Sequence, residues 1–156
     1  MKKIIGFLFI QIFMIHNTFA IALTEVKTQQ DVIEKIPLIM AQTMRDSCKR
    51  ELPLLSEKLD EAYKKGLVQL ILASQNAEVN GVKISQHPNF HQQIPEMQKQ
   101  QLKKMVSEIS DSVKPFNSLK MCTAFIDDLN QLDAEKLKKE GVEKYKQYKQ
   151  RQQNLE

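Results

Sequence analysis

The residues of this chain that could do chemistry are few, and the two cysteines, Cys48 and Cys122, come first. Neither has the C-x-x-C spacing or the histidine partner that favours a reactive thiolate. Each instead continues an apolar stripe at helical spacing, so both thiols are expected to face the core. In an oxidising compartment two such cysteines usually pair, and we predict one disulfide that joins two packed helices. Two buried free thiols are the alternative.

His87 and His91 lie four residues apart, a spacing at which a helix could present two imidazoles to one metal ion. Pro88 disfavours the helical conformation at His87, so the spacing loses its geometric meaning. The closest carboxylate, Glu96, does not stand at a motif spacing. The pattern favours two exposed histidines at the start of a helix, and we predict no metal site.

The remaining polar residues form no recognisable catalytic motif. Asp60-Glu61 and Asp127-Asp128 are adjacent carboxylates, but neighbours on a helix point about 100° apart, so only one of each pair could face a cleft. No serine stands in a G-x-S-x-G or S-x-x-K motif. The chain also lacks the C-x-x-C-H motif of covalently bound haem, and its methionines stand at the helical spacing typical of core packing. We predict that the protein is not an enzyme and holds no cofactor.

Residues 1–20 have the pattern of a signal peptide. A short basic start precedes an apolar run over 4–15, and small residues then allow cleavage after Ala20 or after Ala22. The run is shorter than the about 20 apolar residues that a membrane span needs. The preference for lysine over arginine is typical of an AT-rich bacterial genome. We predict a bacterial protein that is exported to the periplasm or secreted, with no transmembrane span after cleavage.

The cysteines and histidines must be positioned by helices, because apolar residues recur at helical spacing over most of the chain. The first predicted helix begins after Thr28 and ends near Arg50. The second follows Pro53, where a proline in the first turn is tolerated. Gly66 is expected to kink or divide this second helix.

Two further helices are predicted after an irregular stretch. The third begins near residues 88–89, or as late as Ile94, and has Met97 on its apolar face. The fourth begins after a proline and has Phe116 and Leu119 on its inner face. The pattern repeats at no period typical of a solenoid.

These elements predict an all-α fold, a single-domain bundle of four main helices over residues 23–132 tied by one disulfide. Residues 133–156 add a charged, partly solvated C-terminal helix or tail, in which seven basic residues are mixed with five acidic ones. The net charge of the whole chain is +4, and the excess of basic over acidic residues lies in the predicted signal peptide and this tail. No nucleic-acid partner is therefore predicted.

The irregular stretch over 76–90 is polar and contains Asn-Gly between two valines, which is a hairpin signal. Loops on a rigid scaffold often carry binding residues, so this stretch is the first candidate for a partner contact. Its alternative role is only to connect two helices. The candidate contact residues are Asn80, Gly81, Lys83, His87, Phe90 and His91, and we expect Phe90 to be exposed.

An exported helical domain without a catalytic motif generally acts by binding. We therefore expect a non-catalytic protein that binds another envelope or secreted protein, in the manner of an immunity protein, an inhibitor or a small chaperone. A homo-oligomer is compatible with this expectation. The alternative is a periplasmic carrier that holds a small ligand, haem or a metal inside the helical bundle.

Overall fold

The structure, a computed structural model, describes residues 22–79 and 81–153. The predicted signal peptide and Asn80 lie outside the described residues. The described part contains five α-helices, which are α2 (Gln29–Glu51), α3 (Ser56–Gln75), α4 (Glu96–Ser112), α5 (Ser118–Gln131) and α6 (Ala134–Gln153). The predicted all-α bundle of four main helices and a C-terminal helix is confirmed.

Short elements connect these helices. Four 3-10 helices are described, η1 (Leu23–Glu25), η2 (Pro53–Leu55), η3 (Ile84–Gln86) and η4 (Pro88–His91). The strands β1 (Glu78–Val79) and β2 (Val82–Lys83) form an antiparallel hairpin. The third helix was predicted too early, because Pro88 begins only the turn η4, and α4 starts directly after Pro95.

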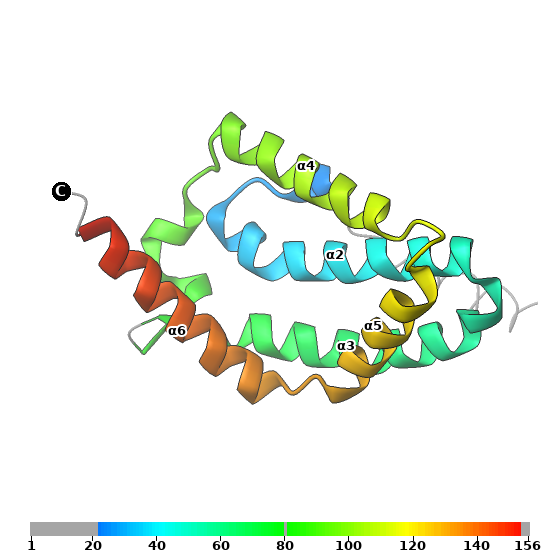
Figure 1. Ribbon diagram of the computed structural model, residues 1–156. Coiled ribbons are helices and arrows are strands. Elements are labelled where there is room, and N and C mark those ends of the chain that lie inside the picture. Colours follow the sequence, from blue (N-terminus) through cyan, green and yellow to red (C-terminus); the bar gives the residue numbers. More distant parts are fainter. Residues whose placement is uncertain (1–21, 80, 154–156) are drawn as a thin grey trace, which may run out of the picture.

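Helix α2 lies at the centre of the molecule (Figure 1). Helix α3 returns antiparallel beside it, and α4 packs on its other side. Helix α5 lies against α3 and the end of α2, while α6 crosses α3 near the hairpin. No helix of the described residues is long and apolar enough to cross a membrane.

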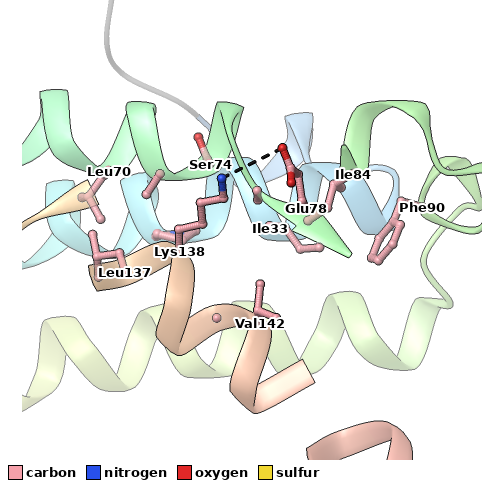
Figure 2. Close-up of a pocket in the computed structure, with 13 residues that line it drawn as sticks. Ile33, Leu70, Ser74, Glu78, Ile84, Phe90, Leu137, Lys138 and Val142 are labelled. Atoms are coloured by element: carbon pink, nitrogen blue, oxygen red, sulfur yellow. Dashed lines mark ion pairs between the residues drawn. The ribbon is translucent and has the colours of Figure 1, made fainter. Parts of the chain in front are cut away.

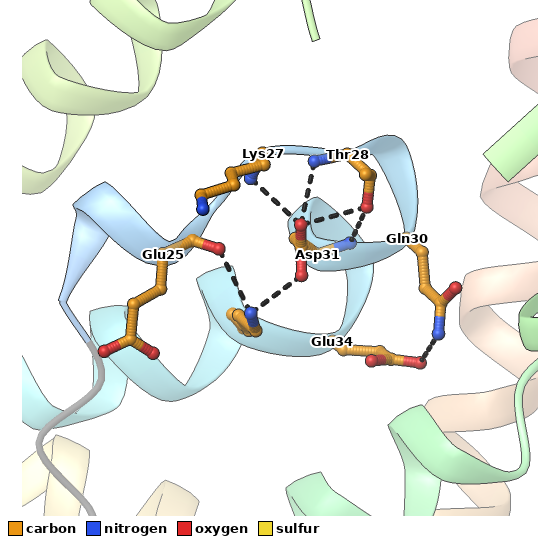
Figure 3. A network of polar contacts seen from close by, with 7 residues as sticks. Glu25, Lys27, Thr28, Gln30, Asp31 and Glu34 are labelled. Atoms are coloured by element: carbon orange, nitrogen blue, oxygen red, sulfur yellow. Dashed lines mark hydrogen bonds and ion pairs between the residues drawn. The ribbon is translucent and has the colours of Figure 1, made fainter. Parts of the chain in front are cut away.

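Helix α2 begins with a capping box, seen in Figure 3. The Thr28 hydroxyl accepts the backbone N–H of Asp31 at 3.2 Å, and the Asp31 carboxylate accepts the backbone N–H of Thr28 at 2.8 Å. The carboxylate also accepts the N–H of Lys27 at 2.9 Å and contacts the Lys35 ammonium at 2.8 Å. Partial burial acts to raise the pKa of Asp31, but the Lys35 contact and the backbone donors outweigh it. The pKa therefore lies well below its usual range.

Asp31→Asn is expected to make the stability of the protein less sensitive to acid. Because folding depresses the pKa of Asp31, its carboxylate stabilises the fold above the unfolded pKa of about 3.9, and this stability is lost as the pH falls toward the folded value. At neutral pH the free energy of unfolding of the variant should be about 1 kcal/mol lower than that of the parent. Between about pH 5 and pH 2 the free energy of unfolding should fall less in the variant than in the parent. Urea denaturation at several pH values measures both. Asp127→Asn, in an exposed residue of α5, is the control, and an unchanged pH slope in Asp31→Asn would contradict the assignment.

The predicted disulfide is confirmed. Cys48 near the end of α2 bonds to Cys122 in the second turn of α5, with a Cα–Cα distance of 5.7 Å. Both residues are fully buried beside Leu59 and Val113. The bond therefore fixes the end of α2 against α5 inside an apolar cluster.

Gly66 does not divide the second helix, because α3 runs without a break from Ser56 to Gln75. A Cβ atom at Gly66 would lie 2.6 Å from Cδ2 and 3.3 Å from Cβ of Leu129. The missing side chain thus lets α5 approach α3 closely. The expectation of a division was wrong, and the glycine instead serves the packing of α5 on α3.

Three large apolar side chains that were predicted to face the core do not. Phe116 is 103% exposed, Met97 72% and Leu119 60%. Phe116 lies in the link between α4 and α5, before the helix starts, so helical spacing did not apply to it. Met97 and Leu119 lie in the first turns of α4 and α5, outside the buried clusters.

Candidate functional site

A pocket of about 390 Å³ lies where α2, α3, the hairpin region and α6 meet. Figure 2 shows its walls, with side chains of α6 facing those of α3 and the hairpin. Most of the lining side chains are apolar. They include Ile33 and Pro37 from α2, Leu70 and Ala73 from α3, Ile84 and Phe90 from the two 3-10 turns, and Leu137 and Val142 from α6.

The hairpin and the turns after it form one end of the pocket. Gly81 has a φ of 78°, which suits the turn that an Asn-Gly pair makes between short strands. The N–H of Ile84 then donates to the carbonyl of Ala77 at 3.0 Å, and this bond closes the loop. Ile84 and Phe90 are buried together against Ile33. The irregular stretch is therefore packed onto α2 and provides an apolar pocket wall.

Pro37 lies inside α2, and it also lines the pocket. Proline has no N–H, so the carbonyl of Ile33 lacks its usual partner within the helix. The rest of α2 compensates through its capping box and its buried face. The helix thus contains a proline, which destabilises a helix interior, at a position that lines the pocket.

Helix α6 covers the pocket from the other side. Its first N–H, of Ala134, donates to Oε1 of Gln69 in α3 at 3.1 Å, and the Asp133 carboxylate accepts the N–H of Lys136 at 2.8 Å. One turn further, Lys138 Nζ lies 4.0 Å from Oε1 of Glu78 in β1. The start of α6 is therefore held to both α3 and the hairpin.

Among the described residues that line the pocket, Glu78 and Lys138 are the only charged ones. Ser74 supplies a hydroxyl, but this hydroxyl donates to the carbonyl of Ile71 at 2.9 Å within α3. The site thus combines an apolar interior with one ammonium and one carboxylate. This composition suits the binding of an apolar molecule better than acid–base or nucleophilic chemistry.

The six candidate contact residues differ in their exposure. Gly81, Lys83 and His91 are exposed, whereas Asn80 lies outside the described residues. Phe90 is buried and lines the pocket, so the expectation that it is exposed was wrong. Whether the exposed members contact a partner stays a prediction.

His87 and His91 differ in their surroundings. His91 is exposed, while the His87 ring stands edge-on to Phe90 with 5.3 Å between ring centroids. Nδ1 of His87 is buried and has no hydrogen-bond partner among the described residues. Within the part of the chain that the structure describes, no three His, Cys, Asp or Glu residues are grouped as metal ligands would be.

The sequence analysis missed the pocket residues of α6. Leu137, Lys138, Gly141 and Val142 were assigned to a partly solvated tail, yet they line the pocket. Their spacing within six residues places them along one face of a helix. That short stripe was the signal available in the sequence.

Comparison with protein-family models, with curated proteins and with solved structures found no match. The function must therefore be argued from the pocket itself.

Proposed function

We propose that the protein is a non-catalytic carrier that binds a small apolar ligand in the pocket between α2, α3, the hairpin and α6. The observation that carries this proposal is the pocket of about 390 Å³ with its apolar lining. Pockets that hold small molecules generally have a few hundred cubic ångströms, apolar walls and a few polar groups. The proposal corresponds to the carrier alternative of the sequence analysis, without haem or metal.

We also propose that the carrier works in the periplasm or outside the cell. The pattern of residues 1–20 supports export. The Cys48–Cys122 disulfide supports an oxidising compartment, because such bonds rarely persist in the cytosol. An apolar ligand would need a carrier there, since it partitions poorly into water.

Filling the pocket tests the proposal, and Gly141 is the position from which to fill it. Gly141 lies in the middle of the α6 stripe that lines the pocket, and a Cβ atom there would have no described atom within 4 Å outside its own stretch of helix. Gly141→Leu should therefore place its side chain in open pocket space without strain. Gly141→Ala, which adds a single methyl group, is the matched control.

The neutral apolar fluorophore N-phenylnaphthylamine is a suitable probe. We expect its fluorescence to rise on binding to the parent protein, and Gly141→Leu to weaken its affinity by about tenfold or more. Gly141→Ala should retain the parent affinity to within about twofold. Equal affinity in the parent and Gly141→Leu, or no binding by the parent, would contradict the proposed function.

A second candidate function, binding of another protein, is favoured by exposed apolar residues near the disulfide. Leu54 is 99% exposed, and Phe116 and Leu119 are also largely exposed. They belong to η2, the α4–α5 link and α5, the elements around the cluster of Cys48 and Cys122. Exposed apolar groups of this kind occur at protein interfaces. An immunity protein, inhibitor or small chaperone acting through them would need Phe116 and would be indifferent to Gly141→Leu.

A further inference from the structure

We propose that the ligand of this pocket is an amphiphile with an alkyl chain and a single carboxylate, a molecule of the fatty-acid class whose carboxylate binds Lys138. This inference rests on the proposed function and names the ligand class. The apolar walls would hold the chain, and the ammonium of Lys138 would hold the head group.

The ammonium of Lys138 can donate hydrogen bonds to a ligand. Its ammonium carries three N–H groups, and among the described residues its one ion-pair contact is with Glu78 at 4.0 Å, beyond hydrogen-bond distance. Its side chain is nevertheless only 26% exposed. An ammonium at a pocket wall that makes no hydrogen bond to Glu78 can bind an anion that reaches it within the pocket.

Lys138 also has the right position on α6. Leu137, Lys138, Gly141 and Val142 all line the pocket, and at 3.6 residues per turn Lys138 and Gly141 form the middle of this stripe. Figure 2 shows the Lys138 side chain extending from α6 along the pocket wall toward Glu78. The ammonium therefore lies at the pocket wall, where a head group can meet it while the chain stays inside.

The hairpin register gives Glu78 a second cation when a ligand carboxylate binds Lys138. Glu78 stands opposite Lys83, and residues paired in this way lie on the same face of the two strands. A ligand carboxylate that binds Lys138 would therefore leave Glu78 beside Lys83. Because Glu135 and Glu143 line a neighbouring hollow together with Lys138 and Lys139, the preference for a carboxylate is expected from the position of the Lys138 ammonium at the pocket wall and not from the local net charge.

Displacement of N-phenylnaphthylamine by head-group variants of one chain tests the inference at neutral pH. The competitors are decanoate, decanol and decylamine, which differ in charge but not in chain length. We expect decanoate to displace the fluorophore from the parent protein at about tenfold lower concentration than decanol, and decylamine to be the weakest. Equal or stronger displacement by decanol or decylamine would overturn the inference.

Variants then assign the preference to Lys138. Lys138→Met should abolish the advantage of decanoate over decanol measured in the same variant, whereas Lys138→Arg should retain that advantage. Lys139→Met, which removes an exposed charge next along α6, is the control and should behave as the parent. Glu78→Gln should strengthen decanoate binding, because it removes the competing carboxylate.

The possible failures are distinguishable. A preference for decanoate that survives Lys138→Met would overturn the role of this residue. Fluorophore binding that Gly141→Leu weakens, without any preference for decanoate, would overturn the ligand class and leave the carrier function standing. Absence of fluorophore binding, or its insensitivity to Gly141→Leu, would overturn both.

Discussion

Loss of the Cys48–Cys122 bond is expected to lower the free energy of unfolding by about 4 kcal/mol. The bond closes a loop with a sequence separation of 74 residues, so breaking it releases much chain entropy in the unfolded state. This amount approaches the whole net stability of many domains. Denaturation of the oxidised protein and of the Cys48→Ala, Cys122→Ala double variant measures the difference.

The control for this experiment is the reducing agent itself. It should shift the denaturation midpoint of the parent toward that of the double variant and leave the double variant unchanged. If the reduced parent kept the midpoint of the oxidised protein, the disulfide would not contribute to stability. The packing of the cysteines beside Leu59 and Val113 would then have to account for the contact of α2 with α5.

Gly66→Val is expected to lower the free energy of unfolding by about 2 to 3 kcal/mol. The first added atom would stand 2.6 Å from Cδ2 of Leu129, and Cβ of the same residue at 3.3 Å cannot move away by a rotamer change. Helix α5 would have to shift away from α3. Thermal or chemical denaturation measures the loss.

Gly141→Val is the matched control, because it makes the same substitution in a helix at a site with open space around Cβ. Helix propensity alone predicts a gain of a few tenths of a kcal/mol there. Similar effects of the two substitutions would show that the close approach of α5 to Gly66 does not limit stability.

Local signals in the sequence predicted most of the fold. Thr28 and Asp31 stand at the spacing of a capping box, and the structure contains that box. The apolar stripes that end at Cys48 and pass through Cys122 predicted two packed helices and their disulfide, and both are present. These features depend on neighbours within a few residues or on the pairing of the only two cysteines.

Errors arose where tertiary contacts decide exposure. Helical spacing gives the face of a helix on which a residue stands, but the cover over that face comes from other elements. Leu119 had the right spacing and no element to cover it. Phe90 stood in a polar stretch that looked solvated, yet the turn η4 folds it against Ile84 and Ile33.

The candidate site was harder to predict than the fold, because its walls come from four parts of the chain. Leu70 and Ile33 stand in the segments predicted as the second and first helices, and they do lie on α3 and α2. Leu137 and Val142 stand in a segment whose polar composition predicts a solvated helix. Only the placement of α6 across α3 and the hairpin brings these side chains together around the pocket.

The most direct test of the carrier function is the location of the bound probe, read from methyl NMR spectra of the protein during titration with N-phenylnaphthylamine. The methyl groups of Ile33, Ile84 and Val142, which line the pocket, should shift in the parent protein and not in Gly141→Leu. The methyl groups of Leu54 and Leu119, near the disulfide, should not move. Shifts confined to Leu54 and Leu119, or pocket shifts that persist unchanged in Gly141→Leu, would contradict binding in this pocket.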